Sequence, residues 1–185
     1  MTDTPHGFQF DRQKFIAAVH FICARQAPSD LGKFKLHKAL FVAELLNFLE
    51  TGQPLCGAEY VRQQPGAVAR QLSWAVGELE RAGKLRVEER VFAGFPKTDF
   101  ISTMAPNGGA LADGERQLLA EVSDFICGRG AHELSELNYE AALALAAPGE
   151  PIPYWSAFAL VPCEVTDGDV EWAKAEARQL GLIES

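Results

Sequence analysis

Hydrophobic residues recur along this chain mostly with the 3.6-residue spacing of helices. A first amphipathic stretch covers residues 12–26, and Asp11 is placed to cap it. A second runs from Ser29 or Asp30 to about Glu50 and is apolar on almost every side. Because a helix without a polar face has to be wrapped by other elements, this second stretch is predicted to be the buried axis of the domain.

The pattern changes after this axis. A short extended piece within residues 51–61 follows a Gly/Pro turn, and residues 67–82 then form the clearest amphipathic helix pattern of the chain. Apolar and polar residues alternate over residues 85–92, and a second extended segment follows at residues 98–103. This predicts a two-stranded hairpin whose loop consists of residues 93–97.

Three more helices are predicted in the second half, over residues 113–127, 136–147 and 169–180. The residues expected to face inward from the first and last of them are Leu118, Val122, Phe125 and Ile126, then Val170, Ala173, Ala177 and Leu180. The whole pattern predicts a mainly α fold, a single-domain helical bundle of about six helices with one β-hairpin after the third helix. The domain is expected to span residues 11–185, after a flexible N-terminus in residues 1–10.

The composition fits one globular domain. Of the 185 residues, 48% are hydrophobic and 23% are charged, which is enough apolar material for a core. No segment approaches the ~18 unbroken apolar residues of a membrane span. The first ten residues lack the pattern of a secretory signal, so a cytoplasmic location is expected.

The net charge of −8 is unevenly distributed. Residues 1–104 hold 13 Lys and Arg against 11 Asp and Glu, a balance of +2, whereas residues 105–185 hold 4 against 14, a balance of −10. An acidic half of this kind is either a solvated face or a surface that steers a basic partner protein. The sequence leaves both interpretations open.

Motifs for catalysis, metal binding and nucleotide binding are missing from the sequence. His132-Glu133 begins like the zinc motif H-E-x-x-H, but Glu136 occupies the place of the second histidine. No C-x-x-C pair is formed by Cys23, Cys56, Cys127 and Cys163. We therefore expect no enzyme activity, no metal and no cofactor. A hydrolase remains an alternative if His20 and His37 converge with a carboxylate in one polar cleft.

A second alternative is DNA binding. The helix over residues 67–82, followed by a hairpin, resembles a recognition helix with a wing, as in a winged-helix-like transcriptional regulator. The candidate phosphate contacts are Arg70, Arg81, Lys84, Arg86, Arg90 and Lys97. Glutamates interleave with them and the protein is acidic, whereas a DNA-binding module is usually strongly basic, so nucleic acid is not the favoured partner.

Several short motifs follow one another in an order typical of one known family. They are Leu31-Gly32-Lys33-Phe34-Lys35-Leu36, Thr51-Gly52-Gln53-Pro54-Leu55-Cys56-Gly57, Pro65 with Val68, Leu79-Glu80-Arg81-Ala82-Gly83, Phe92-Ala93-Gly94-Phe95, Leu134-Ser135-Glu136-Leu137 and Gly149-Glu150-Pro151-Ile152-Pro153-Tyr154. Together they resemble the Panacea domain, also called the SocA-like antitoxin family, over some 120 residues. The chain departs from the family at Asn138, where a histidine is usual. We interpret this position as a hydrogen-bonding site at a helix start, which asparagine also fills.

The resemblance implies an antitoxin of a toxin–antitoxin system, which neutralises its cognate toxin by direct protein–protein binding. It also suggests a proteolytic adaptor that delivers the toxin to an AAA+ protease. The candidate toxin-binding residues are Glu133, Glu136, Asn138, Glu150, Tyr154 and Phe95. We further hypothesise that the acidic half meets a basic toxin surface through Glu133, Glu136, Glu150, Glu164, Asp167 and Asp169.

Overall fold

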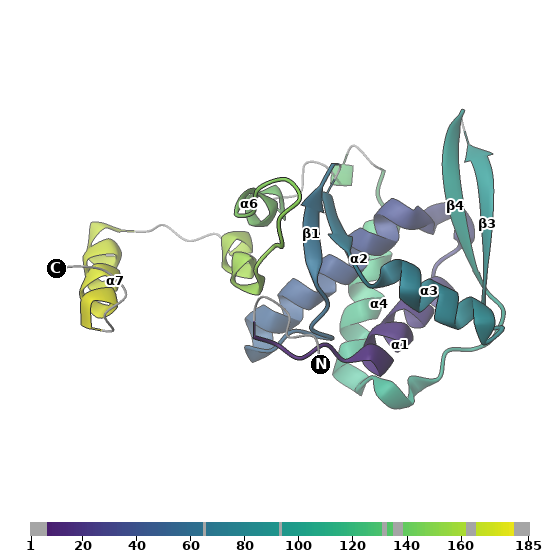
Figure 1. Cartoon of the computed structure of the whole chain (residues 1–185), viewed down its shortest axis with the longest axis horizontal. Coiled ribbons are helices and arrows are strands. Elements are labelled where there is room, and N and C mark those ends of the chain that lie inside the picture. The colour runs from purple at the N-terminus through teal and green to yellow at the C-terminus, as the bar shows by residue number, and fades with distance from the viewer. Residues whose placement is uncertain are drawn as a thin grey trace.

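The computed structural model describes residues 7–64, 66–92, 94–130, 133–134, 139–161 and 166–179 (Figure 1). Helix α1 (Arg12–Arg25) begins as predicted at Asp11, whose side chain accepts a 2.9 Å hydrogen bond from the Lys14 N–H. Residues 1–6 of the predicted flexible N-terminus lie outside the described part, whereas Phe8 and Phe10 lie against the core.

Helix α2 (Pro28–Thr51) is the axis of the fold, as its all-round apolar surface predicts. It contacts α1, α4 (Asp113–Cys127), two of the strands and the 3-10 helix η2 (Tyr154–Leu160). Its start differs from the prediction, because Ala27 is the N-cap and Pro28 opens the first turn, in place of Ser29 or Asp30. A kink at Gly32, with φ of 63°, follows one turn later.

The prediction of a mainly α bundle with one hairpin is wrong, because the described residues contain two two-stranded antiparallel sheets. Residues Gly66–Ala69 form strand β2 and pair with β1 (Tyr60–Gln63), although a helix was predicted from residue 67 onward. Helix α3 is correspondingly shorter, Leu72–Arg81. The helical period of this segment is overridden because β2 is mostly buried and rests against α2. The fold is therefore mixed α and β.

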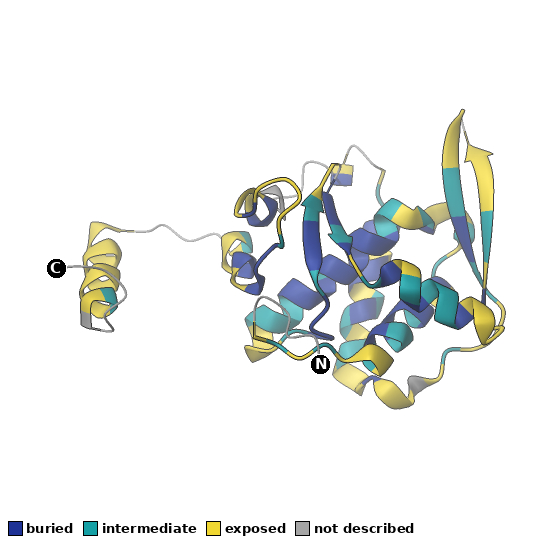
Figure 2. Ribbon diagram, in the orientation of Figure 1, coloured by how far each residue is buried: buried dark blue, intermediate teal, exposed yellow. Residues whose placement is uncertain are grey.

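The second sheet is the predicted hairpin with a shorter turn. Strands β3 (Leu85–Phe92) and β4 (Phe95–Ser102) pair along their full length, so the predicted five-residue loop contains only two residues. Gly94 has φ of 84°, a conformation that tight hairpin turns favour. The hairpin projects from the body, and Figure 2 shows that its far end is exposed.

The second half is less regular than predicted. Helix α4 has the predicted bounds, but Leu119 is fully buried while Phe125 is exposed. Helix α6 is described over Tyr139–Ala144, and residues 135–138, where its start was predicted, lie outside the described part. A short 3-10 turn, η1 (Gly108–Ala110), precedes α4.

Helix α7 (Asp167–Gln179) forms close to the predicted place, but its predicted inward stripe is not buried. Val170 and Ala173 are exposed and Ala177 is only half-buried, while Leu180 lies outside the described residues. Figure 1 shows α7 apart from the rest of the chain. Among the described helices, none has the length and apolar character needed to cross a bilayer.

Candidate functional site

The β3–β4 hairpin is held midway along its length by a buried carboxylate. The Asp99 carboxylate contacts Lys97 Nζ at 2.8 Å and Arg90 Nε at 3.2 Å. Lys97 Nζ also donates hydrogen bonds to the carbonyl oxygens of Pro28 and Ser29, at 2.9 and 2.7 Å. These contacts tie β4 to the first turn of α2 and so fix the direction in which the hairpin projects.

The tip of this hairpin is apolar and exposed. The exposed fractions are 78% for Val91, 71% for Phe92 and 74% for Phe95. The register places Phe92 opposite Phe95 and Val91 opposite Pro96. Because cross-strand partners share a face of the sheet, the two phenylalanines lie on one face and the Val–Pro pair on the other. We call these four residues the hairpin tip. Clusters of exposed apolar side chains of this kind mark interaction surfaces.

Most of the predicted DNA-contacting residues are engaged by carboxylates. Arg70 pairs with Glu59 and Arg81 with Glu78, each at 2.6 Å. Arg86 and Arg90 both contact Glu88, and Lys97 and Arg90 contact Asp99. The sixth residue, Lys84, is half-buried beside His20. The carboxylates reduce the positive field that a phosphate backbone would meet, so the surface is a poor match for DNA.

The acidic residues proposed to meet a toxin are spread over several elements. Glu133 and Glu150 are exposed, and Glu133 accepts a hydrogen bond from the Gly130 N–H at 2.8 Å. Asp167 and Asp169 are exposed in the first turn of α7. Glu136, Asn138 and Glu164 lie outside the described residues. The described members therefore do not form one patch on the body.

Tyr154 is not available to a partner in this structure. Its side chain is only 4% exposed, and its hydroxyl donates a 2.5 Å hydrogen bond to the Ala58 carbonyl oxygen. The ring of Phe8 lies edge-on to it at 5.7 Å. Of the candidate toxin-binding residues, the structure therefore places Phe95 on the surface and Tyr154 in the interior.

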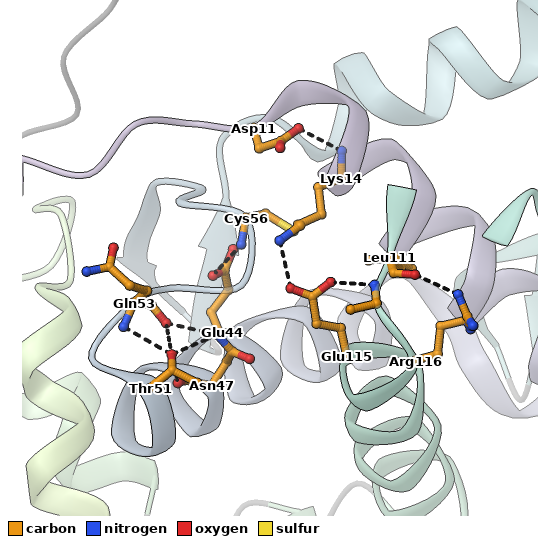
Figure 3. A network of polar contacts seen from close by, with 11 residues as sticks. Asp11, Lys14, Glu44, Asn47, Thr51, Gln53, Cys56, Leu111, Glu115 and Arg116 are labelled. Carbon is orange, nitrogen blue, oxygen red and sulfur yellow. Dashed lines mark hydrogen bonds and ion pairs between the residues drawn. The ribbon is translucent and has the colours of Figure 1, made fainter. Parts of the chain in front are cut away.

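Sequence reasoning missed two buried charged residues on α2. The carboxylate of Glu44 accepts hydrogen bonds from the N–H groups of Cys56 and Ala58, at 3.0 and 3.3 Å, as Figure 3 shows for Cys56. Lys38 Nζ donates to the Leu134 carbonyl oxygen. The signal in the sequence was a charged residue within an otherwise apolar helix, because such a residue must find polar partners in the interior.

Burial raises the pKa of Glu44 to about 7. The hydrogen bonds from the backbone lower this pKa, but their effect is smaller than that of burial. No ion pair joins Glu44 to a cation of the described residues. Tyr60 and Tyr154 lie near it, and burial, followed by the charge of Glu44, raises the pKa of each hydroxyl. Glu44 thus fixes the loop before β1 through the backbone, a structural role that exposes no reactive group.

A polar pocket of about 580 Å³ opens between α1, the end of α2 and the start of α4 (Figure 3). Lys14 Nζ and Glu115 form an ion pair of 2.7 Å in its wall. Thr51 Oγ1 donates to the Asn47 carbonyl oxygen at 2.7 Å and accepts the Gln53 N–H at 3.1 Å. These polar groups of the wall therefore bond to one another.

The two histidines of the hydrolase alternative are used separately. His20 Nε2 lies 3.1 Å from both Ser102 Oγ and the Met104 carbonyl oxygen, and burial lowers its pKa. His37 Nδ1 accepts the Ala69 N–H at 3.1 Å, and burial, followed by the charge of Lys33, lowers its pKa to about 4. The required convergence with a carboxylate is not found in the described part.

The cysteines of the described part are buried free thiols. Burial raises the pKa of Cys23 to about 12 and of Cys127 to about 11, and raises that of Cys56 as well. Thiols with raised pKa values are poor nucleophiles. Cys163 lies outside the described residues. No group of three or more His, Cys, Asp or Glu side chains suited to a metal ion occurs where the structure is described.

Comparison with known proteins adds no relative. No family model, no curated protein and no solved structure matches this chain.

Proposed function

We propose that this protein is an antitoxin that neutralises a cognate toxin protein by direct binding, and that the hairpin tip is the part that docks. The resemblance of its motifs to the Panacea domain supplies the class of function. The observation that carries the assignment to a site is the exposure of Val91, Phe92 and Phe95 on a hairpin that stands clear of the body.

The shape of the tip defines what it fits. Apolar side chains lie on both faces of the hairpin, with Phe92 and Phe95 on one and Val91 and Pro96 on the other. A flat surface would bury only one face, so the matching partner has an apolar cleft that closes around the tip. Burying an apolar side chain of this size contributes about 2 kcal/mol, so three of them can dominate an interface.

The contacts in the middle of the hairpin support this role. Lys97 and Asp99 hold β4 against α2, so the tip is presented in one orientation before the partner arrives. Preorganisation of this kind reduces the entropy lost on binding. Delivery of the bound toxin to an AAA+ protease is a further step of the same proposal, and it needs no change at the tip.

Growth rescue tests the proposal. The product of the neighbouring gene is expressed in a bacterial host, with this protein or its variants supplied from a second plasmid. The unmodified protein is expected to restore growth, and a triple variant, Val91→Ser with Phe92→Ser and Phe95→Ser, is expected to fail. Purified proteins should show an affinity loss of at least about 100-fold for the triple variant.

Met104→Ser is the matched control, because Met104 is also exposed and apolar but lies beyond the end of β4. Full rescue by the triple variant would remove the hairpin tip as the docking site. A failure of the unmodified protein to restore growth, with both proteins shown to be present, would remove the antitoxin function for this gene pair.

A further inference from the structure

A second group of exposed apolar side chains lies at the C-terminal side of the body. Trp155 and Phe158 of η2 are 55% and 61% exposed, and Val161, directly after η2, is 47% exposed. Leu145, which follows α6, is 47% exposed. We call these four residues the η2 surface. The Phe158 ring is anchored by an edge contact with Phe48 at 6.1 Å, so the surface is held firmly by α2.

Helix α7 has an apolar stripe that is not packed against another described element. Val170, Ala173 and Ala177 recur at helical spacing on one side of the helix, where Val170 and Ala173 are exposed and Ala177 is half-buried. Thr166 and Asp169 cap the helix reciprocally: the Asp169 N–H donates to Thr166 Oγ1 at 3.3 Å, and the Thr166 N–H donates to the Asp169 carboxylate at 2.9 Å. A helix of 13 residues is nevertheless marginal in water without a surface to pack on, because few hydrogen bonds repay its nucleation.

The short connection limits how far α7 can lie from the η2 surface. Only residues 162–165 separate Val161 from Thr166. At about 3.5 Å per residue, α7 must begin within roughly 17 Å of the η2 surface. A tether this short gives an effective concentration on the order of millimolar, which an untethered competitor seldom reaches.

We propose that α7 packs its Val170–Ala173–Ala177 stripe against the η2 surface of its own chain. The structure shows α7 apart from the body, so the packed form is a second arrangement in equilibrium with it (Figure 1). Packing covers Trp155 and Phe158 and gives α7 the apolar contact that stabilises it. The hairpin tip stays exposed in both arrangements, so the inference is independent of the proposed function.

Fluorescence quenching of the purified full-length protein tests this. Trp74→Phe and Trp172→Phe leave Trp155 as the only indole. In this background the stripe is disrupted by Val170→Gln, Ala173→Gln and Ala177→Gln. The acrylamide quenching constant of Trp155 is expected to rise at least twofold. The matched control, Glu171→Gln with Lys174→Gln and Arg178→Gln, alters the rest of α7 and should leave the constant unchanged.

A second measurement, on α7 itself, does not depend on the surroundings of the indole. Hydrogen exchange in residues 167–179 is expected to accelerate at least tenfold in the Phe158→Ser variant, because α7 loses its support. Equal quenching constants in the stripe variant and the control, or unchanged exchange, would overturn the proposal. So would a dimer of the unmodified protein that becomes a monomer in the stripe variant, because α7 would then pack on a second copy.

Discussion

The β1–β2 hairpin and the β3–β4 hairpin share an antiparallel pairing but are placed very differently. The first has four-residue strands that are mostly buried and lie against α2. The second has eight-residue strands that are buried only near the body and end in an exposed apolar tip. The comparison teaches that strand length decides the role here. A short hairpin is absorbed into the core, whereas a long one extends past it and displays its end.

Removing the ring of Tyr60 from the first hairpin should have the largest effect on stability. The ring is buried and lies 5.2 Å from that of Phe41. Tyr60→Ala is expected to lower the free energy of unfolding by about 4 kcal/mol, because it leaves a cavity in the core. Urea denaturation measures this loss.

The control at the same position is Tyr60→Phe. Within the described part of the chain the buried Tyr60 hydroxyl has no hydrogen-bond partner. Its removal should therefore leave stability unchanged or raise it slightly. A loss of several kcal/mol in Tyr60→Phe would show that the hydroxyl is satisfied and that the two hairpins differ less in their buried polar groups.

The contribution of Glu44, which holds the loop before β1, to the stability of the fold should depend on pH. The pKa of Glu44 is raised to about 7 from its ordinary value of 4.5, so the folded state holds this proton more tightly than the unfolded state. The resulting stabilisation is complete below pH 4.5 and is lost as the pH rises to about 7. It amounts to about 3 kcal/mol. The stability difference between the unmodified protein and Glu44→Gln should fall accordingly across this range.

His37 should act in the opposite direction. Its pKa is lowered to about 4 from 6.5, so the unfolded state binds the proton more tightly and stability rises with pH between these values. The two slopes oppose each other, which predicts a nearly flat curve for the unmodified protein from pH 4.5 to 6.5. Urea titrations should show a rising curve for Glu44→Gln and a falling one for His37→Asn. Parallel curves for all three proteins would contradict both assignments.

Breaking the anchor of the second hairpin should cost less. Lys97→Met removes one of two cations from buried Asp99 and the bonds to Pro28 and Ser29. We expect a loss of about 2 kcal/mol in the free energy of unfolding, because the Asp99 carboxylate is left incompletely paired. Arg86→Met is the control, since its pair with Glu88 is mostly exposed and should contribute less than about 1 kcal/mol. Equal losses in the two variants would argue against the anchor.

The hairpin tip should matter least for stability. Phe95→Ser changes a side chain that is exposed in the folded state, so the thermal unfolding midpoint is expected to stay within about 2 °C of that of the unmodified protein. A drop as large as that of Tyr60→Ala would mean that the tip is part of the core. The contrast between the two hairpins would then fail.

Part of the fold could be predicted from local patterns. A few neighbouring residues are enough to predict the cap at Asp11, the bounds of α4 and the alternation in β3. The central position of α2 could also be predicted, because a helix that is apolar on all sides must be surrounded by other elements. Within the candidate site, the sequence contained the two phenylalanines that flank the turn, and Phe95 was named as a candidate toxin-binding residue. The sequence did not indicate that Phe95 is exposed.

What the sequence by itself determined is therefore the set of elements whose signal lies within one helical turn or one strand alternation. Tertiary structure decided the rest, because it depends on partners distant in the chain. Residues 66–69 form a strand because β1 and α2 lie beside them, and Arg90 forms an ion pair with Asp99. Burial alone raised the pKa of Glu44, a carboxylate whose sequence neighbours give no hint of the loop that it holds.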